Sequence, residues 1–340
     1  MASIIPIFIP HEGCPHSCIF CNQNSISGST SKRITPADVT AIIETWLDHY
    51  LSKQAHPVQV AFYGGSFTGL EHQRQQELLG AVAPFVDQGR VHQIRLSTRP
   101  DYIDQDKLDL LKKAKVDIVE LGVQSLDNVV LRQSGRGHSK EDVYSAVGLL
   151  QKGSFQVGMQ LMLGLPGQSF RSLRRTVEQT TLLQPDFVRI YPVLVVKGSG
   201  LEQAYQKGSY TPLSLGKAIL QAAYMKKNFD RAGIRVIRMG LQPGESLENS
   251  LLAGPYHPSF GEMVLSRLML KQTRALLQGQ EDSCPTLVIN SKDMSIFKGI
   301  RSANMYRLSA LGLVDCFTLR TDDSQPRYHI TRRGGEEAYW

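Results

Sequence analysis

Three cysteines near the N-terminus are the first side chains whose types and spacing point to chemistry. Cys14, Cys18 and Cys21 follow the pattern C-x3-C-x2-C. Thiolates at such short spacing allow one loop to reach three corners of an iron–sulfur cube. The fourth iron then lacks a protein ligand, and an open coordination position marks a metal that takes part in chemistry. The spacing therefore predicts a 4Fe–4S cluster with one corner available to another molecule.

Three other interpretations of these thiols stay open. The alternatives are a structural zinc site with His11 or His16 as the fourth ligand, an electron-transfer cluster completed by Cys284 or Cys316, and three unrelated buried thiols. A disulfide framework is disfavoured because the chain has an odd count of 5 cysteines in 340 residues.

The segments that must position the cysteines alternate between two patterns. Apolar, β-branched runs predict strands at residues 4–9, 58–63, 93–97, 116–121, 157–163 and 187–191. Amphipathic stretches between them predict helices at residues 36–54, 71–85, 105–113, 140–152 and 169–183. Such alternation predicts an α/β fold, a partial (β/α)6 TIM-like barrel with its site at the carboxyl ends of the strands.

The pattern changes after residue 191. A helix at 213–232, a strand at 234–238, an irregular Gly/Pro-rich stretch at 240–261 and a helix at 262–277 are expected. We expect residues 1–240 to form the core and residues 241–340 a small C-terminal α+β extension. In that extension, a strand at 287–290, a helix at 303–311 and a hairpin of 314–319 with 328–331 resemble a winged helix.

Positive charge is concentrated in one part of the chain. The net charge is +7, and residues 170–240 hold 12 Lys/Arg against 4 Asp/Glu. A concentrated basic region suggests a polyanionic partner such as tRNA or another RNA, although solvated helix faces are the alternative. Residues 281–340 carry 8 Lys/Arg and 8 Asp/Glu, which favours a structural cap for that segment.

The sequence predicts no membrane association. No apolar run approaches the ~20 residues that span a bilayer. The apolar residues 1–10 lack a basic segment and a small-residue cleavage site, so they predict a first buried strand rather than a signal peptide. We expect the protein in the cytoplasm.

The cysteine motif, with Phe20 before its last cysteine, resembles the signature of the radical S-adenosylmethionine superfamily. Further segments follow in order: residues 63–68 (YGGSFT), 98–102 (TRPDY), 119–125 (VELGVQS), 136–138 (RGH), 164–167 (GLPG) and 189–192 (RIYP). As an ordered set over residues 4–240, they resemble the radical domain of the catalytic subunit of Elongator, which modifies the wobble uridine of tRNA.

The resemblance implies cofactors and residue roles. Cys14, Cys18 and Cys21 would hold a 4Fe–4S cluster that cleaves S-adenosylmethionine to a 5′-deoxyadenosyl radical, with the help of an electron donor. The residues implied to bind these cofactors are Phe20, Gly64, Gly65, Ser66, Ser97, Thr98, Arg99, Gln124, Arg136, Gly164 and Leu165. The turn at 64–66 would bind the methionine amino group, residues 97–99 the ribose or carboxylate, and residues 164–165 the adenine. A plain turn-forming or loop-fixing role remains the alternative for each of these groups.

Two departures from the Elongator pattern bear on function. The first two cysteines are closer together here, and about 100 residues after position 240 contain no acetyl-CoA-like glycine pattern. The complete Elongator reaction therefore does not follow. Three hypotheses remain: a radical enzyme acting on tRNA or another RNA, a radical enzyme acting on a small molecule or partner protein, and a non-enzymatic metal-binding module. The sequence leaves the oligomeric state open.

Overall fold

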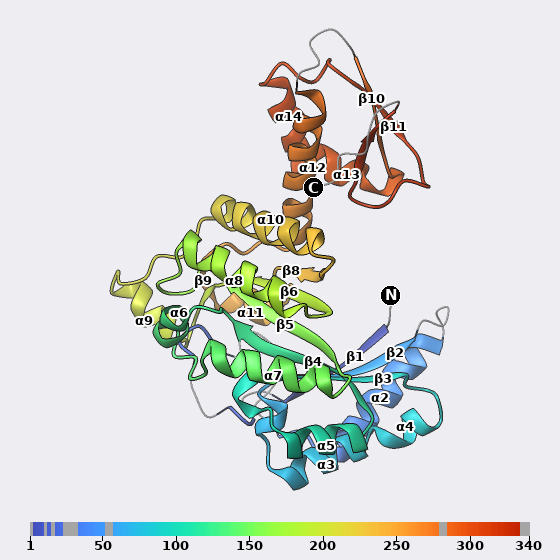
Figure 1. Cartoon of the computed structure of the whole chain (residues 1–340), viewed down its shortest axis with the longest axis vertical. Coiled ribbons are helices and arrows are strands. Elements are labelled where there is room, and N and C mark those ends of the chain that lie inside the picture. Colours follow the sequence, from blue (N-terminus) through green and yellow to red (C-terminus); the bar gives the residue numbers. More distant parts are fainter. Residues whose placement is uncertain are drawn as a thin grey trace.

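A curled parallel sheet organises most of the chain (Figure 1). The computed structural model describes residues 3–9, 12–14, 18–22, 33–51, 57–278 and 284–333. In this part of the chain the main sheet has 7 strands, in the order β1 (Ser3–Ile9), β2 (Val58–Gly64), β3 (Gln93–Thr98), β4 (Val116–Gln124), β5 (Gln156–Leu163), β6 (Phe187–Pro192) and β8 (Arg235–Met239). Every neighbouring pair is parallel. The predicted α/β partial barrel is confirmed, and β8 extends it by one strand beyond the expected six.

Helices connect the strands and cover one face of the sheet. They are α2 (Pro36–Leu51), α3 (His72–Gly80), α4 (Ala83–Asp87), α5 (Gln105–Lys113), α6 (Asn128–Gln133), α7 (Lys140–Lys152), α8 (Phe170–Leu183) and α10 (Leu215–Arg231). The single helix expected over 71–85 is two helices, because the chain turns at Ala81 and Val82 and Pro84 lies in the first turn of the second helix. α7 begins with a complete capping box between Ser139 and Asp142, at the start of the helix expected over 140–152.

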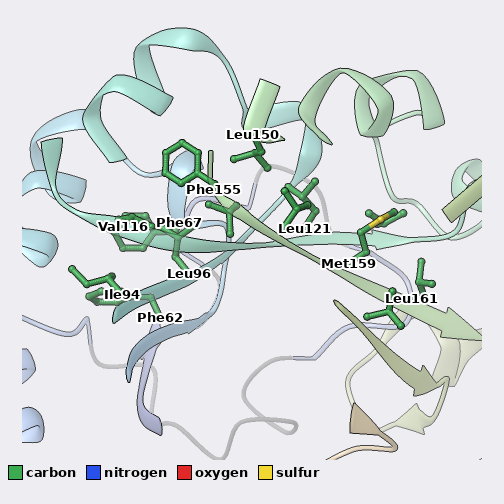
Figure 2. Packing of buried hydrophobic residues seen from close by; sticks show 14 of the residues in the cluster. Phe62, Phe67, Ile94, Leu96, Val116, Leu121, Leu150, Phe155, Met159 and Leu161 are labelled. Carbon is green, nitrogen blue, oxygen red and sulfur yellow. The ribbon is translucent and has the colours of Figure 1, made fainter. Parts of the chain in front are cut away.

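The main core lies between the sheet and these helices. Phe62, Leu96, Leu121 and Met159 come from four successive strands and lie close together on the helix-covered face (Figure 2). Side chains alternate between the two faces of a strand, so the residues next to these in sequence face the other side of the sheet. That second face carries the polar side chains described below.

A second group of elements follows the sheet. β7 (Val195–Val196) pairs with β9 (Leu251–Ala253), and α9 (Gly200–Gln206) and α11 (Glu245–Ser250) flank this ribbon. The stretch expected to be irregular therefore contains a short helix and a strand. None of the helices in the described ranges is long and apolar enough to cross a bilayer.

The helix α12 (Phe260–Leu277) belongs to two cores. Phe260 and Val264 pack in the main core, whereas Met269 and Leu277 pack in a smaller one. The smaller core is completed by β10 (Thr286–Ile289), α13 (Met294–Lys298), α14 (Ala303–Ser309), β11 (Thr318–Thr321) and β12 (Ile330–Arg332). We call residues 284–333 the C-terminal module; in Figure 1 it lies beyond α10, at the far end of α12. The domain boundary near residue 240 stays a prediction.

The hairpin expected in this module is wrong. The strand order is β11-β10-β12, so β11 and β12 flank β10 rather than pairing with each other. Leu287 and Ile289 of β10 are fully buried, whereas β11 is mostly exposed. The strand with two buried apolar residues takes the centre, and the crossover through α13 and α14 makes β11 parallel to it.

Candidate active site

The cysteine segment lies against the rim of the sheet and is anchored at both ends. Before Cys14, the amide of Ser66 donates to the carbonyl of Glu12 at 2.9 Å, and a Cβ at Gly65 would overlap the same carbonyl. After Cys18, the amide of Ile19 donates to the carbonyl of Ser134 at 3.1 Å. The glycines of the 64–66 turn therefore allow β2 to approach the segment that carries the first cysteine.

Arg136 joins the cysteines to the end of β4. Its Nη1 donates to Cys18 Sγ at 3.2 Å, and its Nη2 donates to the Gly122 carbonyl at 2.5 Å. Burial raises the pKa of the Cys14 thiol, and the nearby Arg136 and Arg99 guanidinium groups act in the opposite direction. Arg136 was expected at this site, and its position gives the thiols a positive neighbour.

The three cysteines lie in one short segment, but they do not form a closed ligand set. The Cys21 amide donates to the Cys18 carbonyl at 3.0 Å, and the Cys18 thiol is one of the groups acting on Cys14. Among the described residues, no three Cys, His, Asp or Glu side chains are grouped to hold a metal ion. His11 and His16, the alternative ligands, lie outside the described residues.

Cys284 and Cys316 do not belong to this site. Both are exposed, and their thiols contact the carbonyls of Asp315 and Gly312 within the C-terminal module. These contacts disfavour either residue as a fourth ligand of the cluster.

A cluster of hydroxyl groups locks the ends of β2 and β3 together. Ser66 Oγ lies 2.9 Å from Thr98 Oγ1 and accepts from the Arg99 amide at 3.2 Å, while Thr68 Oγ1 lies 2.5 Å from Thr98 Oγ1. Ser66, Thr68 and Thr98 are buried. Ser97 accepts from Gln160 Nε2 at 3.2 Å. These hydroxyls position the strand ends, and their roles toward S-adenosylmethionine stay predictions.

Several buried side chains at this rim have a polar atom without a partner in the described part of the chain. They include Arg99 at Nη1, Gln124 at Oε1 and Arg136 at Nε. Arg99 is fixed by Asp101 through two hydrogen bonds of 2.9 and 2.7 Å, which leave Nη1 unused. Gln124 ends β4 with φ of 66°, a left-handed conformation that is costly for any residue but glycine. Unsatisfied buried groups and local strain are features of sites prepared for a ligand.

Phe20 and Leu165 meet in one apolar cluster, although 145 positions separate them in the sequence. Gly164, next to Leu165, has φ of 86° and donates its amide to Gln168 Oε1 at 2.7 Å. The Tyr210 hydroxyl donates to the Gly164 carbonyl at 2.6 Å. The structure thus joins the aromatic residue of the cysteine motif to the predicted adenine edge.

The face of the sheet opposite the helices carries a polar network to which the sequence-based predictions assign no role. Glu120 is fully buried and lies 3.3 Å from Arg95 and 2.9 Å from Arg189. Arg189 also donates to the Tyr63 hydroxyl at 3.1 Å, and Gln160 donates to Glu120 at 3.1 Å. In the sequence, Tyr63, Glu120 and Arg189 lie in the quoted motif segments 63–68, 119–125 and 189–192, and Glu120 alternates with the core residues Val119 and Leu121.

Comparisons with known proteins place this geometry in a family. The radical SAM superfamily model matches residues 8–180, and the radical SAM C-terminal domain model matches residues 185–269. The tRNA uridine(34) acetyltransferase of Methanocaldococcus infernus is 28% identical over 262 residues, covering 66% of this chain and 49% of that protein. The heme chaperone HemW of Lactococcus lactis is 25% identical over 184 residues, covering 54% and 47%.

The structural comparison agrees with the sequence comparison on the fold. The archaeal Methanocaldococcus infernus Elp3, with an N-terminal deletion, matches with a TM-score of 0.62 and 22% identity, over 79% of this chain and 63% of that one. The chain spans about half the length of these two curated relatives. Because the superfamily model covers half of the chain and the sheet shares the fold of a solved relative, the chain belongs to the radical SAM superfamily.

Proposed function

We propose that the chain is a radical S-adenosylmethionine enzyme that acts on tRNA or another RNA, with Cys14, Cys18 and Cys21 as the cluster ligands. The observation that carries the proposal is the position of Arg136. This residue contacts Cys18 and the end of β4 at once, so it connects the cysteine segment to the part of the sheet that holds Arg99 and Gln124.

The residues present fit both cofactors of the superfamily, a 4Fe–4S cluster and S-adenosylmethionine. Thiolates are the usual iron ligands of such clusters, and the Arg136 and Arg99 guanidinium groups partly offset the burial that raises the pKa of Cys14. The unpartnered Nη1 of Arg99 and Nε of Arg136 are donors suited to a carboxylate, and Gln124 Oε1 is an acceptor suited to an ammonium or a hydroxyl group. Together the two cofactors supply one-electron cleavage of a carbon–sulfur bond.

The chain's own residues then have three tasks. Asp101 orients Arg99 through a two-point contact, and Arg136 holds Cys18 against Gly122. The hydroxyl cluster of Ser66, Thr68 and Thr98 fixes the relative positions of the strand ends. Phe20 and Leu165 supply an apolar wall suited to an adenine ring.

An RNA substrate is supported by two independent features. Relatives with the superfamily fold are named tRNA uridine(34) acetyltransferases, and the region 170–240 carries a strong positive excess. Because the chain covers only part of those relatives, the acetyl transfer in their name is not carried over to it.

Anaerobic reconstitution with iron and sulfide tests this proposal. We expect the wild type to bind iron and sulfide and, with a reductant, to release 5′-deoxyadenosine from S-adenosylmethionine at a rate that rises when total tRNA is added. Cys18→Ser should lose both properties, whereas Cys316→Ser, which alters an exposed cysteine outside the site, should retain them. Zinc without iron and sulfide would contradict the enzyme, and a rate unaffected by tRNA would contradict the RNA substrate.

A further inference from the structure

A groove runs between α10 and α12, on the side of the sheet edge formed by β8. Two adjoining hollows of about 410 and 690 Å³ make up this groove. They share Lys227, Arg231 and Lys271 in their linings, so they form one continuous depression. The second hollow extends to Arg327 and Tyr328 of the C-terminal module. We call this depression the α10–α12 groove.

The groove is lined by cations from both helices. α10 contributes Lys227 and Arg231, and α12 contributes Arg267, Lys271 and Arg274. No carboxylate lines the first hollow, and the one acid lining the second, Asp230, is bound by Lys226 at 2.5 Å. On each helix two of these cations are four residues apart, which is about 6 Å along the axis. The groove therefore presents two facing rows of positive charge rather than a single cationic point.

These cations differ from the others in the basic region. On α8, Arg174 lies 3.2 Å from Glu178, and Arg175 lies 3.7 Å from Asp127. In the groove, Arg231, Arg267 and Arg274 have no ion pair with any described carboxylate. Two arginines of α8 thus face a carboxylate, whereas these three groove arginines face none among the described residues.

Holding the groove cations together is unfavourable in the unliganded protein. Burial lowers the pKa of Lys227, and the like charges of Lys271 and Arg231 lower it further. A bound polyanion would relieve this repulsion, which is the usual reason for clustered cations at an anion site.

Aromatic rings at both ends of the groove distinguish a nucleic acid from a compact anion. Tyr224 lines the first hollow and packs edge-on against the exposed Phe170, with ring centroids 5.2 Å apart. Tyr328 lines the second hollow, with the Arg327 guanidinium 4.8 Å above its ring. Cations that track a backbone, combined with rings on which bases stack, are the pattern of single-stranded nucleic-acid grooves.

We propose that the α10–α12 groove binds the phosphate backbone of the RNA, with the C-terminal module forming one wall. The RNA identity rests on the proposed function, whereas the location rests on the groove itself. The neutral overall charge of residues 281–340 hides this contribution, because Arg327 and Tyr328 act together with cations of α10 and α12.

Binding of a fluorescent, unmodified tRNA transcript at several salt concentrations tests the location. We expect Arg231→Gln with Lys271→Gln to weaken binding by about 10-fold or more at low salt. The slope of log K against log salt should become less steep by about one unit per lost phosphate contact. The matched pair Arg174→Gln with Arg175→Gln removes the same charge from α8 and should change affinity by less than about 2-fold, because those cations are already paired. Midpoints of thermal unfolding check that both variants fold.

The outcomes separate the groove from the proposed function. Wild-type protein that binds no tRNA overturns both the RNA substrate and the groove assignment. Wild-type binding that is equally weakened by the groove and α8 pairs, or by neither, overturns the groove alone. Displacement of bound tRNA by poly-glutamate at lower concentration than by unlabelled tRNA would also overturn it, since an acidic protein would then be the better occupant.

Discussion

The rim of the sheet and the α10–α12 groove both contain several arginines, but these arginines differ in whether a carboxylate pairs with them. At the rim and on the inner face, Arg99 is paired with Asp101, and Arg95 and Arg189 share the buried Glu120. In the groove, Arg231 and Arg267 have no carboxylate among the described residues within ion-pair distance. Paired buried cations are fixed in place and suit a small cofactor, whereas unpaired surface cations keep their field available to a large polyanion. The difference indicates one site prepared for precise binding and another for electrostatic attraction.

Removing the carboxylate of Glu120, which Arg95 and Arg189 share, tests the importance of the buried ion pairs, and we expect it to have the largest effect. Glu120→Gln leaves Arg95 and Arg189 buried without compensation, and we expect it to lower the free energy of unfolding by about 3–5 kcal/mol. Glu178→Gln breaks an exposed pair on α8 and should cost at most about 0.5 kcal/mol. Urea unfolding measures the loss of stability in both variants. If Glu120→Gln loses no more stability than Glu178→Gln, the network around Glu120 is not structurally important.

The pH dependence of protein stability gives a second measure of the positive charges at the rim. Burial, followed by Arg136 and Arg99, lowers the pKa of His138 to about 2. The unfolded state takes up a proton at His138 near pH ~6.5, whereas the folded state does not. The contribution of neutral His138 to the free energy of unfolding is therefore fully present above that pH. It should fall by up to about 1.4 kcal/mol per pH unit as the pH drops from ~6.5 toward 2.

His138→Gln should flatten this dependence, as measured by urea unfolding between pH 7 and pH 4.5. His329→Gln, which alters an exposed histidine beside the groove, serves as the control. Equal slopes for wild type and His138→Gln would remove His138 from the account.

Loss of the Arg136 link should have an effect of intermediate size. Arg136→Gln removes the donors to Cys18 Sγ and the Gly122 carbonyl, at a cost of about 1.5–3 kcal/mol for a charged hydrogen bond. The reconstituted variant should also retain less iron per chain. Arg132→Gln changes an exposed arginine nearby on α6 and should retain full iron content. Full iron content in Arg136→Gln would show that the link is unimportant for the cluster.

Relieving the strain at Gln124 should give the smallest change, and of opposite sign. Gln124→Gly fits the left-handed backbone and should raise stability by up to about 1 kcal/mol, yet weaken S-adenosylmethionine binding measured by calorimetry. Ser154→Gly relieves a similar conformation outside the site and should stabilise without changing that affinity. If both variants bind the cofactor equally, Gln124 has no contact with it.

The main sheet was predictable because its central strands are buried on both faces. Runs such as residues 157–163 are mostly apolar, with Gln160 as the polar exception, and caps such as Ser139 mark the helix starts. Strand pairing in the C-terminal module was not predictable in this way. Nothing local in residues 318–321 shows that they pair with β10, since the choice depends on which strand buries Leu287 and Ile289.

The two charge patterns also differ in how well they could be predicted from the sequence. Cys14, Cys18, Cys21 and Arg136 lie in recognisable motifs. Glu120 also lies in one, at residues 119–125, but nothing local shows that it pairs with Arg95 and Arg189. The basic region of 170–240 signals the α10 half of the groove. Arg267, Lys271 and Arg274 lie beyond it, and only the packing of α12 against α10 brings the two rows together.

Electron paramagnetic resonance of the reduced, reconstituted protein tests the central claim most directly. If three cysteines of this segment hold a cluster with one open iron, the spectrum of a reduced 4Fe–4S cluster should be present and should change when S-adenosylmethionine is added. A cluster spectrum that is identical with and without S-adenosylmethionine, or the same spectrum in Cys18→Ser as in the wild type, would contradict the account.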